Sequence, residues 1–153
     1  MKNFLKENIT HILFLILVGV VLILWGKLAL DAVSQNAAIY GLDSTEKRVK
    51  CIESYGWEVD ETSETKEIVY IPKEFDDVYK RYNKIQKMSG FDLTKYRGKS
   101  VMRYTFKVLN FPYSEETEAF LNIFVYENKM IAGDCLTVAL DGLMLPIDRR
   151  YIG

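Results

Sequence analysis

The sequence contains one histidine, His11, and it lies within the N-terminal apolar stretch. The 123 residues after Leu30 therefore have no imidazole, which excludes Ser-His and Cys-His nucleophile pairs and metal sites with a histidine ligand from that part of the chain. Two distant cysteines, Cys51 and Cys135, cannot form a zinc site without carboxylate ligands. The nine glycines form no phosphate-binding pattern. The composition thus predicts no cofactor, no metal and no catalytic set.

The chain also lacks a surplus of positive charge. After Leu30 it has 17 basic and 20 acidic side chains, a net charge of −3. A general nucleic-acid-binding protein needs enough basic residues to neutralise phosphates. We therefore expect no nucleic-acid partner.

Charged residues are absent between Glu7 and Lys27. The 22 residues from Ile9 to Leu30 would form roughly 33 Å of helix, enough for a hydrocarbon core of about 30 Å. Lys2 and Lys6 precede the span, which favours a cytoplasmic N-terminus by the positive-inside rule. We therefore predict a cytoplasmic segment at 1–8, a single-pass transmembrane helix or signal anchor at 9–30, and a juxtamembrane linker with a possible helical start at 31–42.

A cleaved signal peptide is the alternative interpretation of this N-terminus. The small residues Ala32 and Ser34 would allow cleavage before Gln35. The apolar stretch is longer than a usual signal-peptide core, and Lys27 and Asp31 interrupt the approach to the site. A retained anchor is therefore favoured.

On the far side of a membrane Cys51 and Cys135 could pair, although two buried thiols are the favoured interpretation.

Periodicity and turn residues predict two helices and five strands after the linker. An acidic N-cap at Asp43 with Glu46 three residues later indicates a helix that ends near Gly56. Pro72 opens a second amphipathic helix, whose apolar stripe includes Tyr79 and Tyr82, and Gly90 ends it. Alternating or continuous apolar stretches predict strands at 57–59, 67–71, 101–109, 119–126 and 130–140, with a hairpin at 127–129 and a turn at 141–142.

The resulting order, α-β-β-α-β-β-β, is typical of an α+β domain. Both helices should pack on one face of a mostly antiparallel sheet. We place this domain at 43–147, followed by a C-terminal tail at 148–153.

Carboxylates are the remaining source of chemistry. Glu58 and Asp60 belong to one acidic cluster, and a second lies at 115–118. Two converging carboxylates could serve a glycosidase or hold calcium, but a solvated acidic loop is the favoured interpretation. Asp134 follows Gly133, where an acid is more often a turn or bulge residue.

Charge is distributed unevenly along the domain. Residues 53–77 carry nine acidic side chains and two lysines, whereas residues 80–107 carry nine basic side chains and one aspartate. The favoured interpretation is internal neutralisation, in which the basic segment packs between the acidic segments of the same domain. The alternative is an exposed basic face that binds lipid headgroups, an anionic envelope polymer or an acidic protein. Its residues would be Lys95, Arg97, Lys99, Arg103 and Lys107.

Several short motifs resemble an uncharacterised family of short bacterial proteins, found mainly in clostridia-like Gram-positive bacteria. They are Tyr55-Gly56-Trp57-Glu58-Val59, Ile71-Pro72 with Phe75, Gly90-Phe91-Asp92-Leu93, Tyr96 with Gly98-Lys99, Val108-Leu109-Asn110-Phe111-Pro112 and Gly133-Asp134. Members have an N-terminal membrane segment and one domain of unknown function, and the similarity covers about residues 49–147. The resemblance implies a bacterial, envelope-facing location and cysteines that need not pair, and it supplies no activity or site residue.

The leading hypothesis is a non-enzymatic, membrane-tethered domain outside the cytoplasmic membrane that binds a protein or an envelope component. The alternatives are a carboxylate-dependent envelope hydrolase that uses Glu58, Asp60 or Asp134, and a secreted protein released by cleavage. A sensor would need a membrane partner, because the segment before the span is too short for a signalling domain.

Overall fold

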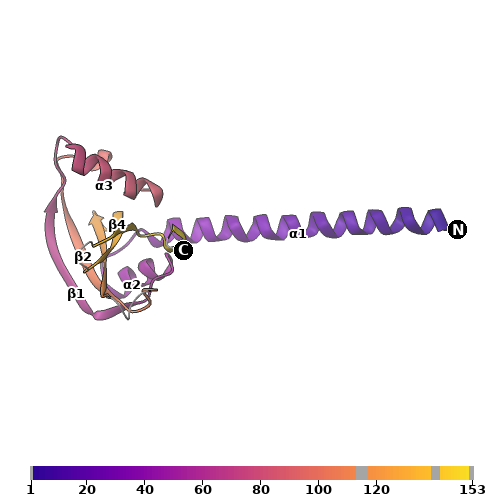
Figure 1. Ribbon diagram of the computed structural model, residues 1–153, viewed down its shortest axis with the longest axis horizontal. Coiled ribbons are helices and arrows are strands. Elements are labelled where there is room, and N and C mark those ends of the chain that lie inside the picture. The colour runs from indigo at the N-terminus through magenta and orange to yellow at the C-terminus, as the bar shows by residue number, and fades with distance from the viewer. Residues whose placement is uncertain (1, 113–116, 139–141, 152–153) are drawn as a thin grey trace. The chain divides into compact units, whose positions relative to one another are not determined.

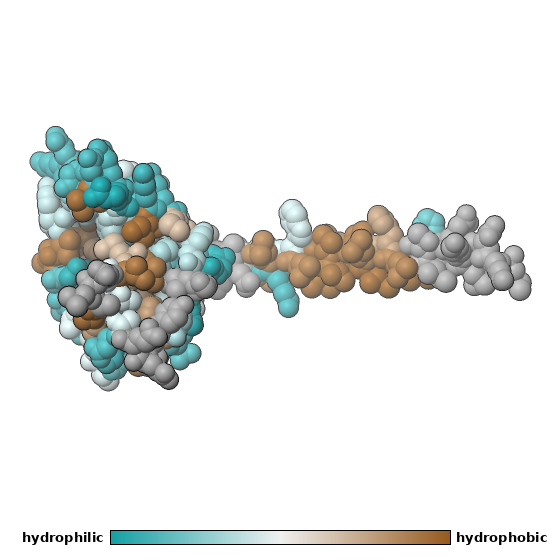
Figure 2. Space-filling view, viewed as in Figure 1, coloured by the Kyte–Doolittle hydropathy of each residue, from teal (hydrophilic) through white to brown (hydrophobic). Residues whose placement is uncertain are grey.

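The computed structural model describes residues 2–112, 117–138 and 142–151, in two compact units, Met1–Asn36 and Ala37–Gly153. Helix α1 (Lys2–Ala38) accounts for nearly all of the first unit. Its segment His11–Leu30 is long and apolar enough to cross a membrane, by length and composition. The apolar side chains of this segment are exposed and form a band along the helix (Figure 2). The helix also includes residues 31–38, where a linker with a helical start was expected.

The second unit is an α+β domain, with helices α2 and α3 beside a sheet (Figure 1). The sheet has five antiparallel strands in the order β1-β2-β3-β4-β5. The predicted fold class is therefore confirmed. Its elements are α2 (Thr45–Glu53), β1 (Val59–Tyr70), α3 (Asp77–Met88), the short 3-10 helix η1 (Leu93–Tyr96), β2 (Ser100–Val108), β3 (Ala119–Tyr126), β4 (Lys129–Thr137), β5 (Met144–Pro146) and the 3-10 helix η2 (Arg149–Tyr151).

The two strands predicted before α3 are the ends of one strand, β1. Its pairing with β2 shifts register between Asp60 and Thr65, so the polar residues between them bulge from the ladder. There the Ser63 hydroxyl accepts a 2.8 Å hydrogen bond from the backbone N–H of Lys107, which the shifted ladder would otherwise leave unpaired. The polar stretch therefore interrupts the register without ending the strand.

Helices α2 and α3 pack on opposite faces of the sheet, so the prediction that both share one face was wrong. Side chains along β3 alternate between two apolar clusters. Leu121 and Ile123 belong to the cluster that includes Ile52 of α2, whereas Phe124 belongs to the cluster against which Tyr82 of α3 packs. Nearly every position of β3 is therefore covered, which is why its sequence is almost continuously apolar.

Neither helix of the domain starts at the predicted residue, and each start is fixed by an N-cap side chain. Ser44, not Asp43, is the N-cap of α2, and its side chain accepts a hydrogen bond from the N–H of Lys47. Asp76 caps α3 by accepting a 2.7 Å bond from the N–H of Tyr79, four residues after the predicted start at Pro72. An Asp or Ser at this position satisfies one of the free N–H groups of the first turn.

The hairpin between β3 and β4 is confirmed. Its two loop residues, Glu127 and Asn128, have φ values of 49° and 59°, as a two-residue turn with a right-handed strand twist requires. Strand β4 ends at Thr137, and the predicted extension to residues 139–140 lies outside the described residues, as do Asp141 of the predicted turn and residues 115–116 of the second acidic cluster.

Residues 147–151 belong to the packed domain, although the sequence analysis assigned 148–153 to a tail. The Trp57 indole donates a 2.6 Å hydrogen bond to the carbonyl of Ile147, which is fully buried. Arg149 donates to the carbonyls of Gly56 and Asn110, at 3.0 Å each. These contacts attach the C-terminal segment to the end of α2 and to the loop after β2.

Candidate functional site

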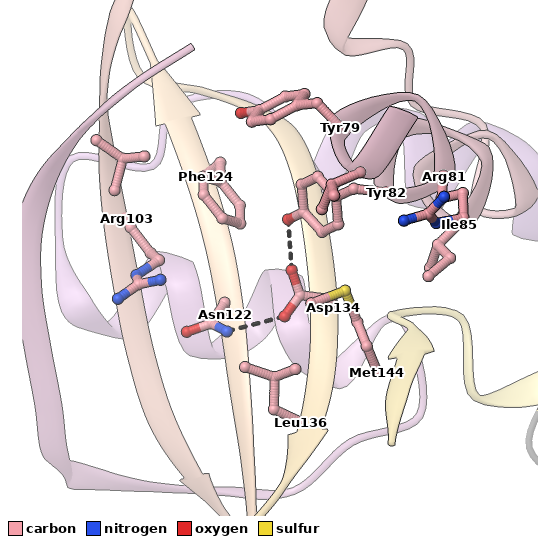
Figure 3. A pocket seen from close by; sticks show the side chains of 12 residues that line it. Tyr79, Arg81, Tyr82, Ile85, Arg103, Asn122, Phe124, Asp134, Leu136 and Met144 are labelled. Atoms are coloured by element: carbon pink, nitrogen blue, oxygen red, sulfur yellow. Dashed lines mark hydrogen bonds between the residues drawn. The ribbon is translucent and has the colours of Figure 1, made fainter. Parts of the chain in front are cut away.

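A groove of about 430 Å³ lies between α3 and the sheet (Figure 3). Helix α3 supplies one wall because its apolar residues recur at helical spacing and face the sheet. Strands β1 to β5 supply the floor and the opposite wall. Most lining side chains are apolar or aromatic: Val69, Val78, Tyr79, Tyr82, Ile85, Phe124, Leu136 and Met144. The polar ones are Arg81, Arg103, Asn122 and Asp134.

The carboxyl of Asp134 is the most deeply buried polar group of the groove, with 1% of the residue exposed. Tyr82 donates a 2.6 Å hydrogen bond to its Oδ2 from α3, and Asn122 donates a 2.8 Å bond to its Oδ1 from β3. The Thr105 hydroxyl of β2 in turn donates to Asn122 Oδ1 at 2.6 Å. A polar chain therefore crosses three strands and reaches the helix, as the two dashed contacts in Figure 3 show in part.

Burial raises the pKa of Asp134 above its ordinary value of 3.8, although the hydrogen bonds from Tyr82 and Asn122 oppose the rise. Burial and the neighbouring Asp134 raise the pKa of the Tyr82 phenol as well, so Tyr82 keeps its proton and acts as the donor of this pair. Each carboxyl oxygen already accepts one hydrogen bond. Asp134 is therefore held in place by its neighbours.

Arg103 is, with Arg81, one of the two cationic side chains among the described residues that line the groove. It lies on β2 directly opposite Glu67 of β1 and forms an ion pair with that carboxylate. Its Nε is buried and has no hydrogen-bond partner within the described part of the chain. A buried N–H without a partner is costly, so this group would gain from a ligand that brings an acceptor.

The structure does not bring the predicted carboxylates together. Of Glu58, Asp60 and Asp134, only Asp134 lines the groove. Glu58 is exposed, and the pKa of Asp60 is held below its usual value by hydrogen bonds from Thr62 in the bulge of β1. The second carboxylate that a glycosidase-type mechanism needs is not among the described residues that line this groove.

Among the residues that the structure describes, no three His, Cys, Asp or Glu side chains converge to form a metal site. Cys51 and Cys135 are free, buried thiols, and burial raises the pKa of each to about 12. Cys51 Sγ contacts Met130 Sδ at 3.6 Å in the core. The favoured interpretation of both cysteines as small apolar core residues is consistent with this arrangement.

The predicted basic face divides into two groups. Arg103 and Lys107 form ion pairs with Glu67 and Glu118 of the neighbouring strands, so internal neutralisation describes these two. Lys95, Arg97 and Lys99 lie exposed in and after η1 and form no ion pair with any described residue. Arg97 stacks over the Phe75 ring at 4.6 Å, and Lys99 lies over the Tyr126 ring at 5.8 Å.

Sequence reasoning missed Tyr82, Asn122 and Lys129 as candidate functional residues. Tyr82 was counted only as part of the apolar stripe of α3. Asn122 carried a usable signal, because a single amide within the apolar strand AFLNIFVY needs a partner when it is buried. Lys129 follows the β3–β4 turn, and its partner Tyr40 is far away in the sequence.

The profile of a family described as Domain of unknown function (DUF4830) matches residues 51–135. This segment covers more than half of the chain and contains the polar groove residues Arg81, Arg103, Asn122 and Asp134, together with Tyr82, which donates to Asp134. No curated protein and no solved structure matches the chain. The match confirms the expected relation to an uncharacterised single-domain family: the chain belongs to the family Domain of unknown function (DUF4830).

Proposed function

We propose that the chain is a membrane-tethered, non-enzymatic binding module at the bacterial cell envelope, and that its ligand occupies the groove between α3 and the sheet. The N-terminus would be cytoplasmic and the α+β domain extracytoplasmic. The segment His11–Leu30 of α1 supports the tether, and Lys2 and Lys6 before it support the orientation.

The groove itself carries this proposal. Ligand pockets are typically about 300–1,000 Å³ in volume, mostly apolar, with a few polar groups that orient the ligand. This groove has about 430 Å³, eight apolar or aromatic side chains, and Arg103 with a buried, unpartnered Nε. We therefore expect a ligand with an apolar body and one hydrogen-bond acceptor.

The state of Asp134 favours binding over hydrolysis. Both of its oxygens accept hydrogen bonds from fixed side chains, so the carboxyl is held in one orientation and has no second carboxylate beside it in the described groove. A hydrolase remains the second candidate, because an acid with a raised pKa in a groove is also what general acid catalysis uses.

Native mass spectrometry of the full chain, extracted from its own membranes in mild detergent, tests the proposal. We expect a small molecule to copurify with the wild-type protein and to be lost from Val78→Trp, which fills the mouth of the groove from an exposed position. Leu109→Trp is the matched control, because Leu109 is similarly exposed and does not line the groove. Equal occupancy in both variants, or no adduct on the wild-type chain, would contradict a ligand-binding groove.

A further inference from the structure

A second surface of the domain combines aromatic rings with cations that form no ion pair with a described residue. We call it the basic-aromatic surface and define it by Lys73, Arg97, Lys99, Lys129, Tyr40 and Tyr126. Lys99 Nζ lies 5.8 Å from the Tyr126 ring centre, and Lys129 Nζ lies 4.8 Å from that of Tyr40. Distant parts of the chain therefore meet here: residue 40, the turn after η1, and the β3–β4 hairpin.

Backbone hydrogen bonds fix the turn that carries Arg97 and Lys99. The N–H of Gly98 donates to the carbonyl of Ile71 at 2.8 Å, and the N–H of Ile71 donates to the carbonyl of Lys99 at 2.9 Å. Gly98 has a φ of +73°, and a Cβ there would lie 3.2 Å from Lys73 Cγ, so Lys73 packs directly on this turn. The Tyr96 ring, 5.8 Å from Tyr126, joins the turn to β3.

Of the cations of this surface, Lys73, Arg97 and Lys99 are exposed, whereas Lys129 is half-buried beside Tyr40. None of the four forms an ion pair with a described residue, whereas Arg103 and Lys107 on the sheet do. The acids adjacent to them in sequence, Glu74 and Glu127, are exposed. Four cations against two carboxylates leave a net positive charge, which attracts a polyanion or an anionic surface.

Chain connectivity limits how far this surface can be from a bilayer that holds α1. The N–H of Met130 donates to the carbonyl of Ile39 at 2.8 Å, and the N–H of Leu42 donates to that of Asn128 at 3.0 Å, so residues 39–42 are fixed to the β3–β4 hairpin. Ile39 lies nine residues after Leu30, and even a fully extended chain of nine residues spans at most about 32 Å. Because this connection is short, a bilayer that holds α1 presents the surface with a high local concentration of headgroups.

We propose that the basic-aromatic surface binds the anionic lipid headgroups of the same bilayer that anchors α1. Lysine and arginine side chains near an anionic leaflet are attracted to it within a Debye length. Tyrosine rings favour the headgroup region, because one end of the ring is apolar and the other is polar. This surface is separate from the groove, so the inference does not depend on the groove holding a ligand.

Hydrogen exchange of the full chain in lipid nanodiscs tests the inference. In discs with 30% phosphatidylglycerol we expect the amides of residues 93–99 and 126–130 to exchange at least about threefold more slowly than in phosphatidylcholine discs. The protection should disappear in 0.5 M salt, because exposed charges are then screened.

Two charge-matched variants separate this surface from general electrostatics. Lys99→Glu with Lys129→Glu should lose the protection, whereas Lys66→Glu with Lys84→Glu, two exposed lysines outside the surface, should keep it. Equal protection in both lipid mixtures, or equal loss in both variants, would overturn the inference. Protection that arises only when soluble polyphosphate is added, and never from phosphatidylglycerol, would assign the surface to a free polymer instead and would also overturn it.

Discussion

The Tyr82 phenol donates a 2.6 Å hydrogen bond to the buried carboxyl of Asp134, and so joins α3 to β4 across 52 positions of the sequence. Both residues line the candidate groove. Burial raises the pKa of Asp134, and this hydrogen bond opposes the rise because Tyr82 donates to the charged form of the carboxyl.

Removal of this hydrogen bond should destabilise the domain. Tyr82→Phe leaves a buried carboxyl oxygen without its partner, and such a loss costs about 1–3 kcal/mol of the free energy of unfolding. Tyr79→Phe is the control, since no hydrogen bond of the Tyr79 hydroxyl exists among the described residues. Denaturant unfolding of the full chain in detergent measures both. Equal losses in the two variants would mean that the bond contributes nothing specific.

Asp134 should make the domain less stable as pH rises. Its folded-state pKa lies above the ordinary 3.8, so between the two values the folded chain holds a proton that the unfolded chain has released. The resulting stability is complete below about pH 4 and is lost as pH rises through the folded-state pKa. Asp134→Asn removes this titration. The wild-type free energy of unfolding minus that of the variant should therefore fall with pH, and a rise would contradict the assignment.

Arg48 should be essential for the attachment of α2 to β1. Its guanidinium is almost fully buried, pairs with Glu64 through Nε at 2.6 Å, and donates to the carbonyl of Leu42 at 3.1 Å. Removal of one partner of a buried pair typically costs about 3–5 kcal/mol, so Arg48→Met should lower the free energy of unfolding by about that amount. Lys50→Met is the control: it breaks the exposed ion pair with Glu46 and should change the free energy of unfolding by less than about 0.5 kcal/mol.

The C-terminal segment should contribute to stability. Arg149→Ala removes two hydrogen bonds to the carbonyls of Gly56 and Asn110 and the contact with the Trp57 ring at 5.5 Å. We expect a loss of about 1–3 kcal/mol in the free energy of unfolding. Lys84→Ala, at an exposed site, should have almost no effect. Equal free energies of unfolding for the two variants would show that residues 148–151 add no stability and form a tail.

The cysteines should be inert in the folded protein. Burial raises the pKa of both Cys51 and Cys135 to about 12, and the thiolate is the reactive form. Iodoacetamide at pH 8 should modify neither thiol over an hour in the native chain and both after unfolding in denaturant. The intact mass should be the same with and without reductant. A decrease of two mass units without reductant would reveal a disulfide instead.

Local patterns were sufficient for most of the secondary structure. The stripe that includes Tyr79 and Tyr82 predicted α3, and the alternation along residues 101–109 predicted β2, because both signals depend only on neighbours in the sequence. The predictions failed where distant parts of the chain compensate for a local feature. The Ser63 hydroxyl accepts a hydrogen bond from the Lys107 N–H and so keeps β1 continuous. The Trp57 indole donates to the carbonyl of Ile147 and so fixes the segment after β5.

The sequence by itself determined the N-terminal apolar helix, the α+β class and the absence of histidine beyond residue 30, because composition and periodicity fix these properties directly. Only the tertiary structure decided which polar residues meet. Asp134, Tyr82 and Asn122 come from three elements, and their contacts follow from strand register and from the face on which α3 packs. The same register pairs Arg103 with Glu67 and leaves Lys99 and Lys129 free of ion pairs with described residues. Side-chain chemistry was thus given by the sequence, whereas the sites depend on long-range packing that local patterns do not encode.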